Sequence, residues 1–172
     1  MDIALLLVRV VVGGTLAAHG AQKLFGWFGG HGLAGAAGFL ESLGFRPGRR
    51  YAWLLGGTEL VAGLALAAGF LTPLAAAGVA GVMLAAIAVV HWRKGFFNVD
   101  GGLEFPLTLA VAALAMAFSG AGRWSLDHAL DWTLGGEAWG ITATVIAALA
   151  AGAVVSTRGI RVHRTGRRPA TA

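Results

Sequence analysis

Residues 52–92 read AWLLGGTELVAGLALAAGFLTPLAAAGVAGVMLAAIAVVHW, and this stretch decides the fold class. It contains two apolar runs, 52–71 and 73–92, and each has the length of about 20 residues that a helix needs to cross a bilayer. The runs meet at Leu71-Thr72-Pro73, with the proline at the first turn of the second run, where its missing N–H costs little. So short a connection predicts a tight hairpin of two transmembrane helices.

Three further apolar runs, 3–24, 103–120 and 138–157, extend the pattern to five predicted spans. Of the 172 residues 57% are hydrophobic and 12% are charged, whereas a soluble domain carries about 25% charged residues. The 28 glycines suit helices that pack closely in lipid. Because cysteine is absent, disulfides and thiolate-bound clusters are excluded. The composition therefore predicts an all-α, polytopic membrane helix bundle.

The charge pattern orients the predicted helices. The net charge of +5 comes mainly from a tail after the last span, and the loops after the first and third spans are also basic. Loops rich in Lys and Arg stay in the cytoplasm, so we predict an outside N-terminus and a cytoplasmic C-terminus. A basic segment directly after a span is typical of a topogenic anchor, and we expect no nucleic-acid partner. The basic residues are Arg46, Arg49, Arg50, Arg93, Lys94, Arg158, Arg161, Arg164, Arg167 and Arg168.

Glu59 is the sharpest functional candidate, because an ionisable side chain inside a membrane helix is costly. It lies about two turns into the second span, too deep for a short carboxylate to reach water. Ala52, Gly56 and Gly63 share its helical face, so we expect the carboxylate to point into a close helix–helix contact. Two hypotheses follow: a structural ion pair between helices, or a site of proton exchange.

The end of the first span carries a second polar group. His19 and Lys23 are four residues apart on one helical face, with Gln22 beside them. In the predicted topology this end meets the cytoplasmic end of the second span, so we expect Lys23 or His19 to pair with Glu59. The structural alternative is that Lys23 extends to the membrane surface while His19 lies in the interface.

The stretch HWRKGFFNVDGGLEFPL, residues 91–107, follows the third span. Turn chemistry and capping of the next helix account for Asp100 and Glu104 on structural grounds. The topology nevertheless places the polar residues of this stretch in the same half of the membrane as Glu59, which predicts one polar site there.

Arg9, on the outer half of the first span, stays unassigned. The candidates are Glu59, His19 and Lys23 as catalytic residues, and Gln22, His91, Asn98, Asp100 and Glu104 as binding residues, with no metal ligands.

Four stretches together resemble the DoxX family of bacterial membrane proteins: LLLVRVVVGGTLAAHGAQKLFG, GGTELVAGLALAAGFLTPLAA, HWRKGFFNVDGGLEFPL and GAGRWSLDHAL. The resemblance covers roughly residues 3–130. It implies a four-helix membrane core over residues 1–130 in a bacterial inner membrane. Beyond the core we expect an additional transmembrane helix over 131–158 and a disordered basic cytoplasmic tail over 159–172.

The resemblance also implies an association with redox chemistry, since the related DoxD type is a subunit of a thiosulfate:quinone oxidoreductase. The leading hypothesis is a membrane subunit of an oxidoreductase system that handles a quinone, with a soluble or membrane redox partner and the lipid bilayer around it. The alternatives are a small-molecule transporter with a proton-coupled carboxylate and a non-catalytic structural membrane partner. Haem held between His19 and His91 is a minor alternative, because two interfacial histidines often occur without it.

Overall fold

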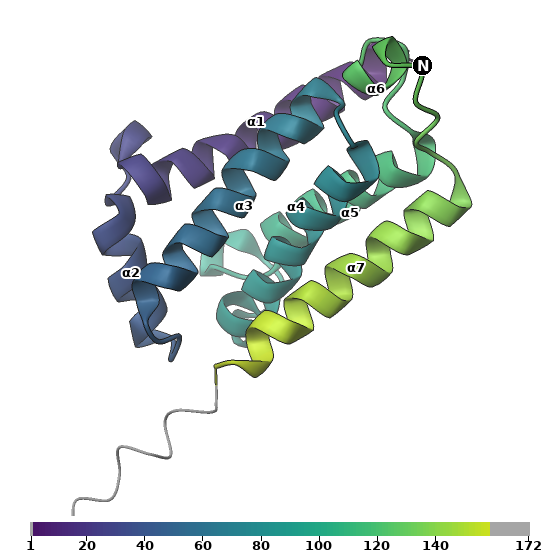
Figure 1. The fold of residues 1–172 in the computed structure, drawn as a ribbon. Helices are drawn as coiled ribbons and strands as arrows, with labels where there is room; N and C mark the ends of the chain where they lie inside the picture. Colours follow the sequence, from purple (N-terminus) through teal and green to yellow (C-terminus); the bar gives the residue numbers. More distant parts are fainter. Residues whose placement is uncertain (1, 159–172) are drawn as a thin grey trace, which may run out of the picture.

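The computed structural model describes residues 2–158 and shows a bundle of helices (Figure 1). The predicted tail over 159–172 lies outside the described residues. The main helices are α1 (Asp2–Phe25), α2 (Gly32–Ser42), α3 (Gly48–Ala68), α4 (Thr72–Ala86), α5 (Glu104–Ser119), α6 (Leu126–Ala129) and α7 (Glu137–Ser156). Short turns of 3-10 helix are η1 (Trp27–Gly29), η3 (Trp92–Lys94) and η4 (Asn98–Asp100), and η2 (Ile87–His91) is a π-helical turn.

Within residues 2–158, four stretches are long and apolar enough to cross a membrane: Asp2–Phe25, Gly48–Ala68, Thr72–Lys94 and Glu137–Ser156. The span expected at 103–120 is α5, which has 16 residues and is shorter than the usual span of about 20. It still runs between the two ends of the bundle, from the turn beside His91 to the loop that contacts Arg9 near the N-terminus. The predicted all-α polytopic bundle is confirmed.

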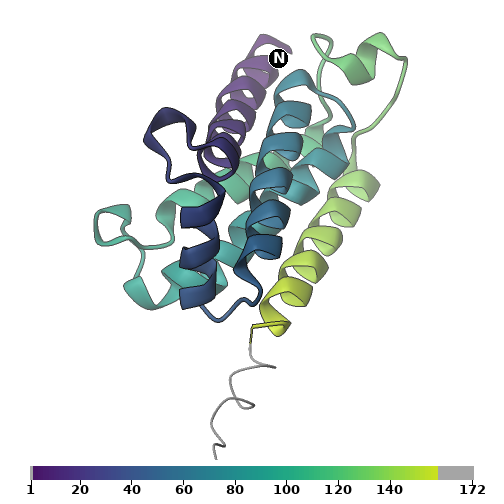
Figure 2. The same cartoon turned by 60° about the vertical axis from the view of Figure 1, so that its left-hand side comes forward.

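The helices pack in two groups, α1–α3 and α4, α5 and α7, which meet where α3 contacts α4. α1 lies along α3, while α4 packs against α3, α5 and α7, so that α7 lies on the opposite side of the bundle from α1 (Figures 1 and 2). Small side chains such as Ala76, Ala80 and Ala113 fill the buried centre. Large apolar side chains such as Val61 and Leu149 are exposed on the outside, as expected for a surface that contacts lipid rather than water.

α1 and α3 approach so closely that their contact is built from glycines. A Cβ atom added to Gly13 would lie 2.4 Å from the Gly63 carbonyl oxygen, and one added to Gly20 would lie 2.6 Å from the Gly56 carbonyl oxygen. Only hydrogen atoms fit between the two backbones at these points. Because no water-driven hydrophobic effect holds helices together in lipid, such close packing is a main source of their association. We call Gly13, Gly20, Gly56 and Gly63 the glycine seam.

The α3–α4 hairpin is closed by a residue of the short helix α6. α3 ends at Gly69, whose φ of 66° lets the Phe70 N–H bond to the Ala65 carbonyl. The side chain of Asp127 then accepts hydrogen bonds from the Leu71 and Thr72 N–H groups, at 2.7 and 3.0 Å, and from the Thr72 hydroxyl. Asp127 is 2% exposed. It therefore satisfies the free N–H groups at the start of α4 and fixes the hairpin turn.

Candidate functional site

The glycine seam brings Lys23 of α1 over Glu59 of α3. The Lys23 ammonium donates to both carboxylate oxygens of Glu59, and each Nζ–Oε distance is 2.5 Å. The Glu59 side chain is 3% exposed and the Lys23 side chain 30% exposed. The predicted ion pair between the first two spans is thus present, and Lys23 rather than His19 provides the cation. Each partner compensates a charge that the apolar interior would otherwise penalise heavily.

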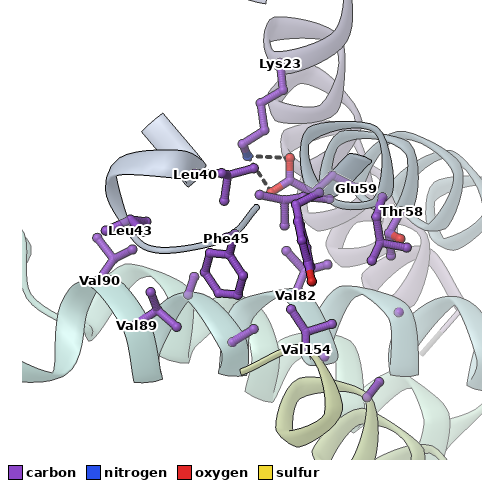
Figure 3. A pocket seen from close by; sticks show the side chains of 18 of the residues that line it. Lys23, Leu40, Leu43, Phe45, Thr58, Glu59, Val82, Val89, Val90 and Val154 are labelled. Carbon is purple, nitrogen blue, oxygen red and sulfur yellow. Dashed lines mark hydrogen bonds and ion pairs between the residues drawn. The ribbon is translucent and has the colours of Figure 1, made fainter. Parts of the chain in front are cut away.

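The ion pair lies on the wall of a cavity of about 480 Å³ (Figure 3). Apolar side chains surround most of it, including Leu40 and Phe45 from the α2 side, Val82 of α4 and Val154 of α7. Sites for small molecules are commonly cavities of about 300–1,000 Å³ with a few polar groups on an apolar wall. The polar side chains on this wall are Lys23, Tyr51, Thr58, Glu59 and His91.

The cavity reaches the outer, lipid-facing surface of the bundle. Phe39 and Leu54 line it, and these two side chains are also 54% and 53% exposed. α2 forms one side of this opening through Phe39 and Leu40. The cavity therefore opens at the surface of the bundle beside Phe39 and Leu54.

His91 lies on the cavity wall at the end of the π-helical turn η2, which directly follows α4. The backbone bonds of a π-helix run from residue i to residue i+5, so this turn is wider than a turn of α-helix. The ring nitrogen Nδ1 of His91 lies 2.7 Å from the carbonyl oxygen of Gly101. The partner is a backbone carbonyl in the turn between η4 and α5, so the turn fixes the orientation of the ring. Lys23, Glu59 and His91 are the predicted site residues that the structure brings to one cavity.

Asn98, Asp100 and Glu104 form a closed turn instead. The Asn98 N–H donates to the Glu104 carboxylate at 2.9 Å, and the Gly102 N–H donates to the Phe97 carbonyl at 3.0 Å. Over residues 2–158, the structure places none of these three predicted binding residues on the cavity wall. Their contact with a ligand stays a prediction, and the structural reason for their presence is the turn that holds His91.

His19 and Gln22 likewise have structural partners. The His19 ring makes an edge contact with the Phe105 ring of α5, with 6.2 Å between ring centres. Gln22 Nε2 donates to the Phe28 carbonyl at 3.1 Å and so holds the turn that follows α1. Neither side chain lines the cavity as the structure describes it. In residues 2–158, no three or more His, Asp or Glu side chains group as metal ligands would.

Arg9 and Asp127 form a buried polar cluster at the opposite end of the bundle. The sequence analysis left Arg9 unassigned and did not identify Asp127 as a buried residue. Arg9 is 1% exposed, and its guanidinium donates to the carbonyl oxygens of Ala121 and Trp124. A signal was present, because Arg9 precedes Gly13 by four residues and Gly20 by eleven and so shares the buried face of α1. Arg9 thus ties α1 to the loop before α6, and Asp127 of α6 closes the α3–α4 hairpin.

The chain matches the family model described as DoxX over residues 4–92. The matched segment contains α1 from Ala4 onward, α2 to α4 and η2, and therefore Lys23, Glu59 and His91. The α7 part of the cavity wall, Ala150 and Val154, lies beyond it. No curated protein and no solved structure matches the chain.

Proposed function

The chain belongs to the DoxX family, and from that premise we propose that it is a membrane subunit of an oxidoreductase system that binds a quinone in the cavity beside Lys23 and Glu59. The observation that carries this proposal is the position of the ion pair: it lies on the wall of an otherwise apolar cavity that reaches the lipid-facing surface. Quinones dissolve in the bilayer and combine an apolar ring with polar oxygens, and the cavity offers both kinds of contact.

Reduction of a quinone requires two electrons and two protons, which convert its two carbonyl oxygens to hydroxyls. Glu59 and Lys23 supply groups that exchange protons next to the bound ring. The electrons come from an oxidoreductase partner or from a small soluble reductant. In this division of labour the chain binds and orients the quinone and moves protons, while the electron donor is a separate molecule.

A binding measurement with a matched pair of variants tests the proposal. Quinones quench tryptophan fluorescence, so a decyl-tailed ubiquinone can be titrated into the purified protein in detergent. Val154→Phe adds bulk to the cavity wall, whereas Val145→Phe makes the same change at an outward-facing position of α7 that is 50% exposed.

We expect saturable binding to the wild type and to Val145→Phe, and binding weaker by about tenfold or more for Val154→Phe, because the ring loses its space. Equal affinity of all three proteins, or no saturable binding to the wild type, would overturn the proposal.

A further inference from the structure

The hydrogen bond of His91 fixes which of its ring nitrogens carries the proton. Its Nδ1 contacts the Gly101 carbonyl oxygen, and a carbonyl oxygen only accepts hydrogen bonds. Nδ1 must therefore be the N–H donor. In the neutral ring the other nitrogen, Nε2, is then an acceptor without a proton. Since the ring lines the cavity, the acceptor Nε2 is the nitrogen left free for a ligand.

The turn that carries Gly101 is rigid enough to hold this arrangement. Its backbone is cross-linked by the bonds Leu103 N–H to Gly95 O and Glu104 N–H to Phe96 O, at 3.1 and 2.9 Å. A Cβ atom on Gly102 would lie 2.5 Å from the Gly95 carbonyl oxygen, so the two sides of the turn are in direct contact. The carbonyl that faces His91 is thus fixed in place, and the ring cannot rotate without losing its partner.

The polar groups of the cavity wall therefore differ in whether they donate or accept hydrogen bonds. Lys23 has three N–H donors and uses two on Glu59, which leaves one for a ligand oxygen. The hydroxyls of Tyr51 and Thr58 donate or accept equally well. Neutral His91 offers only an acceptor, so it is satisfied by a ligand hydroxyl and is opposed by a ligand carbonyl.

We propose that the cavity binds the reduced, hydroxyl-bearing form of its ring ligand more tightly than the oxidised, carbonyl form, and that His91 is the residue that discriminates between them. This inference rests on the proposed function, since it concerns the same cavity. The quinol donates from a hydroxyl to Nε2, whereas the quinone places a second acceptor against it. An acceptor that the bound ring shields from solvent without supplying a donor weakens binding by about tenfold or more. A tenfold preference for the reduced form raises the midpoint potential of a bound two-electron couple by about 30 mV.

The test compares decylubiquinone with decylubiquinol under anaerobic conditions at about pH 8. For the wild type we expect a dissociation constant for the quinone about tenfold or more above that for the quinol. His91→Phe keeps a ring of similar bulk and removes the acceptor, and we expect the ratio to fall to about one. His91→Gln, whose amide can donate or accept, gives the same result and serves if the first variant does not fold.

His128→Phe is the matched control, because it makes the same substitution at an exposed histidine of α6 at the opposite end of the bundle. It should keep the ratio of the wild type. Equal binding of both forms to the wild type, or a ratio that survives in His91→Phe and His91→Gln, overturns this inference and leaves the proposed function standing. Failure of both forms to bind the wild type overturns the proposed function and the inference together.

Discussion

The ion pair between Lys23 and Glu59 joins α1 to α3 on the wall of the cavity. The depth of Glu59 and the small residues on its face predicted a buried pair with α1, and the structure confirms it. The sequence left both Lys23 and His19 as partners. The structure selects Lys23 because the His19 ring packs against Phe105, a residue more than eighty positions away along the chain. That contact depends on tertiary structure and has no local signal.

Arg9 could not be assigned for a different physical reason. Its partners are backbone carbonyls of the loop after α5, and any sequence supplies carbonyls. The buried face of α1 indicates that Arg9 points inward, but nothing in the residue types indicates which backbone segment meets it. The Lys23–Glu59 pair was therefore predictable, while the bonds of Arg9 to backbone carbonyls were not.

Replacing one member of the ion pair should destabilise the protein more than replacing both. Lys23→Met leaves the carboxylate of Glu59 buried without a cation, and we expect a loss of about 3–5 kcal/mol in the free energy of unfolding. The double variant Lys23→Met, Glu59→Gln removes both charges and should recover a large part of that loss. Thermal unfolding in detergent measures the three proteins, and a double variant as unstable as Lys23→Met would contradict this account.

At the scale of elements, the positions of the helices were predictable and their ends were not. The span expected at 52–71 is α3, Gly48–Ala68. The helix ends before Leu71 because Gly69 is in a left-handed conformation and Leu71 also has a positive φ of 46°. Hydropathy continues through Phe70 and Leu71, so it cannot show that the helix has stopped. The capping by Asp127 that stabilises this turn comes from α6, more than fifty residues away along the chain.

Adjacent glycines of α1 provide a test of the glycine seam. Gly13 faces the α3 backbone, whereas a Cβ atom on Gly14 would meet no atom within 4 Å. Gly13→Val should force the helices apart and lower the free energy of unfolding by about 1–3 kcal/mol or more. Gly14→Val should leave stability nearly unchanged. Thermal unfolding of both variants in detergent checks this, and equal losses for the two would exclude a close α1–α3 contact at Gly13.

At the scale of the whole molecule, the two ends of the bundle have different chemistry. One end holds the cavity, and there the Arg158 side chain of the segment after α7 bonds to the Leu43 carbonyl beside α2. The other end holds the Arg9–Asp127 cluster and the Asp2–Arg123 ion pair. From topology alone, the sequence predicted a polar site in the half of the membrane that holds Glu59, which is the end with the cavity. It could not separate the residues that line the cavity from those that build the adjoining turn.

The predicted topology can be tested directly because the chain contains no cysteine. Val99→Cys places a thiol in the turn before α5, where the residue is 91% exposed, and Leu130→Cys places one in the loop before α7, where it is 48% exposed. With the N-terminus outside, a membrane-impermeant thiol reagent should label Leu130→Cys in intact cells and Val99→Cys only after permeabilisation. The reverse pattern would refute the orientation.

Photolabelling in liposomes tests the claim that a quinone occupies the cavity beside Lys23 and Glu59. A quinone with a photoreactive group on its ring is illuminated in the presence of the protein, and mass spectrometry locates the label. We predict label on residues of the cavity wall such as Leu40, Val82 and Val89, suppressed by excess unlabelled quinone. Label confined to outward-facing residues such as Val61 and Leu149, or label that excess quinone does not suppress, would contradict the claim.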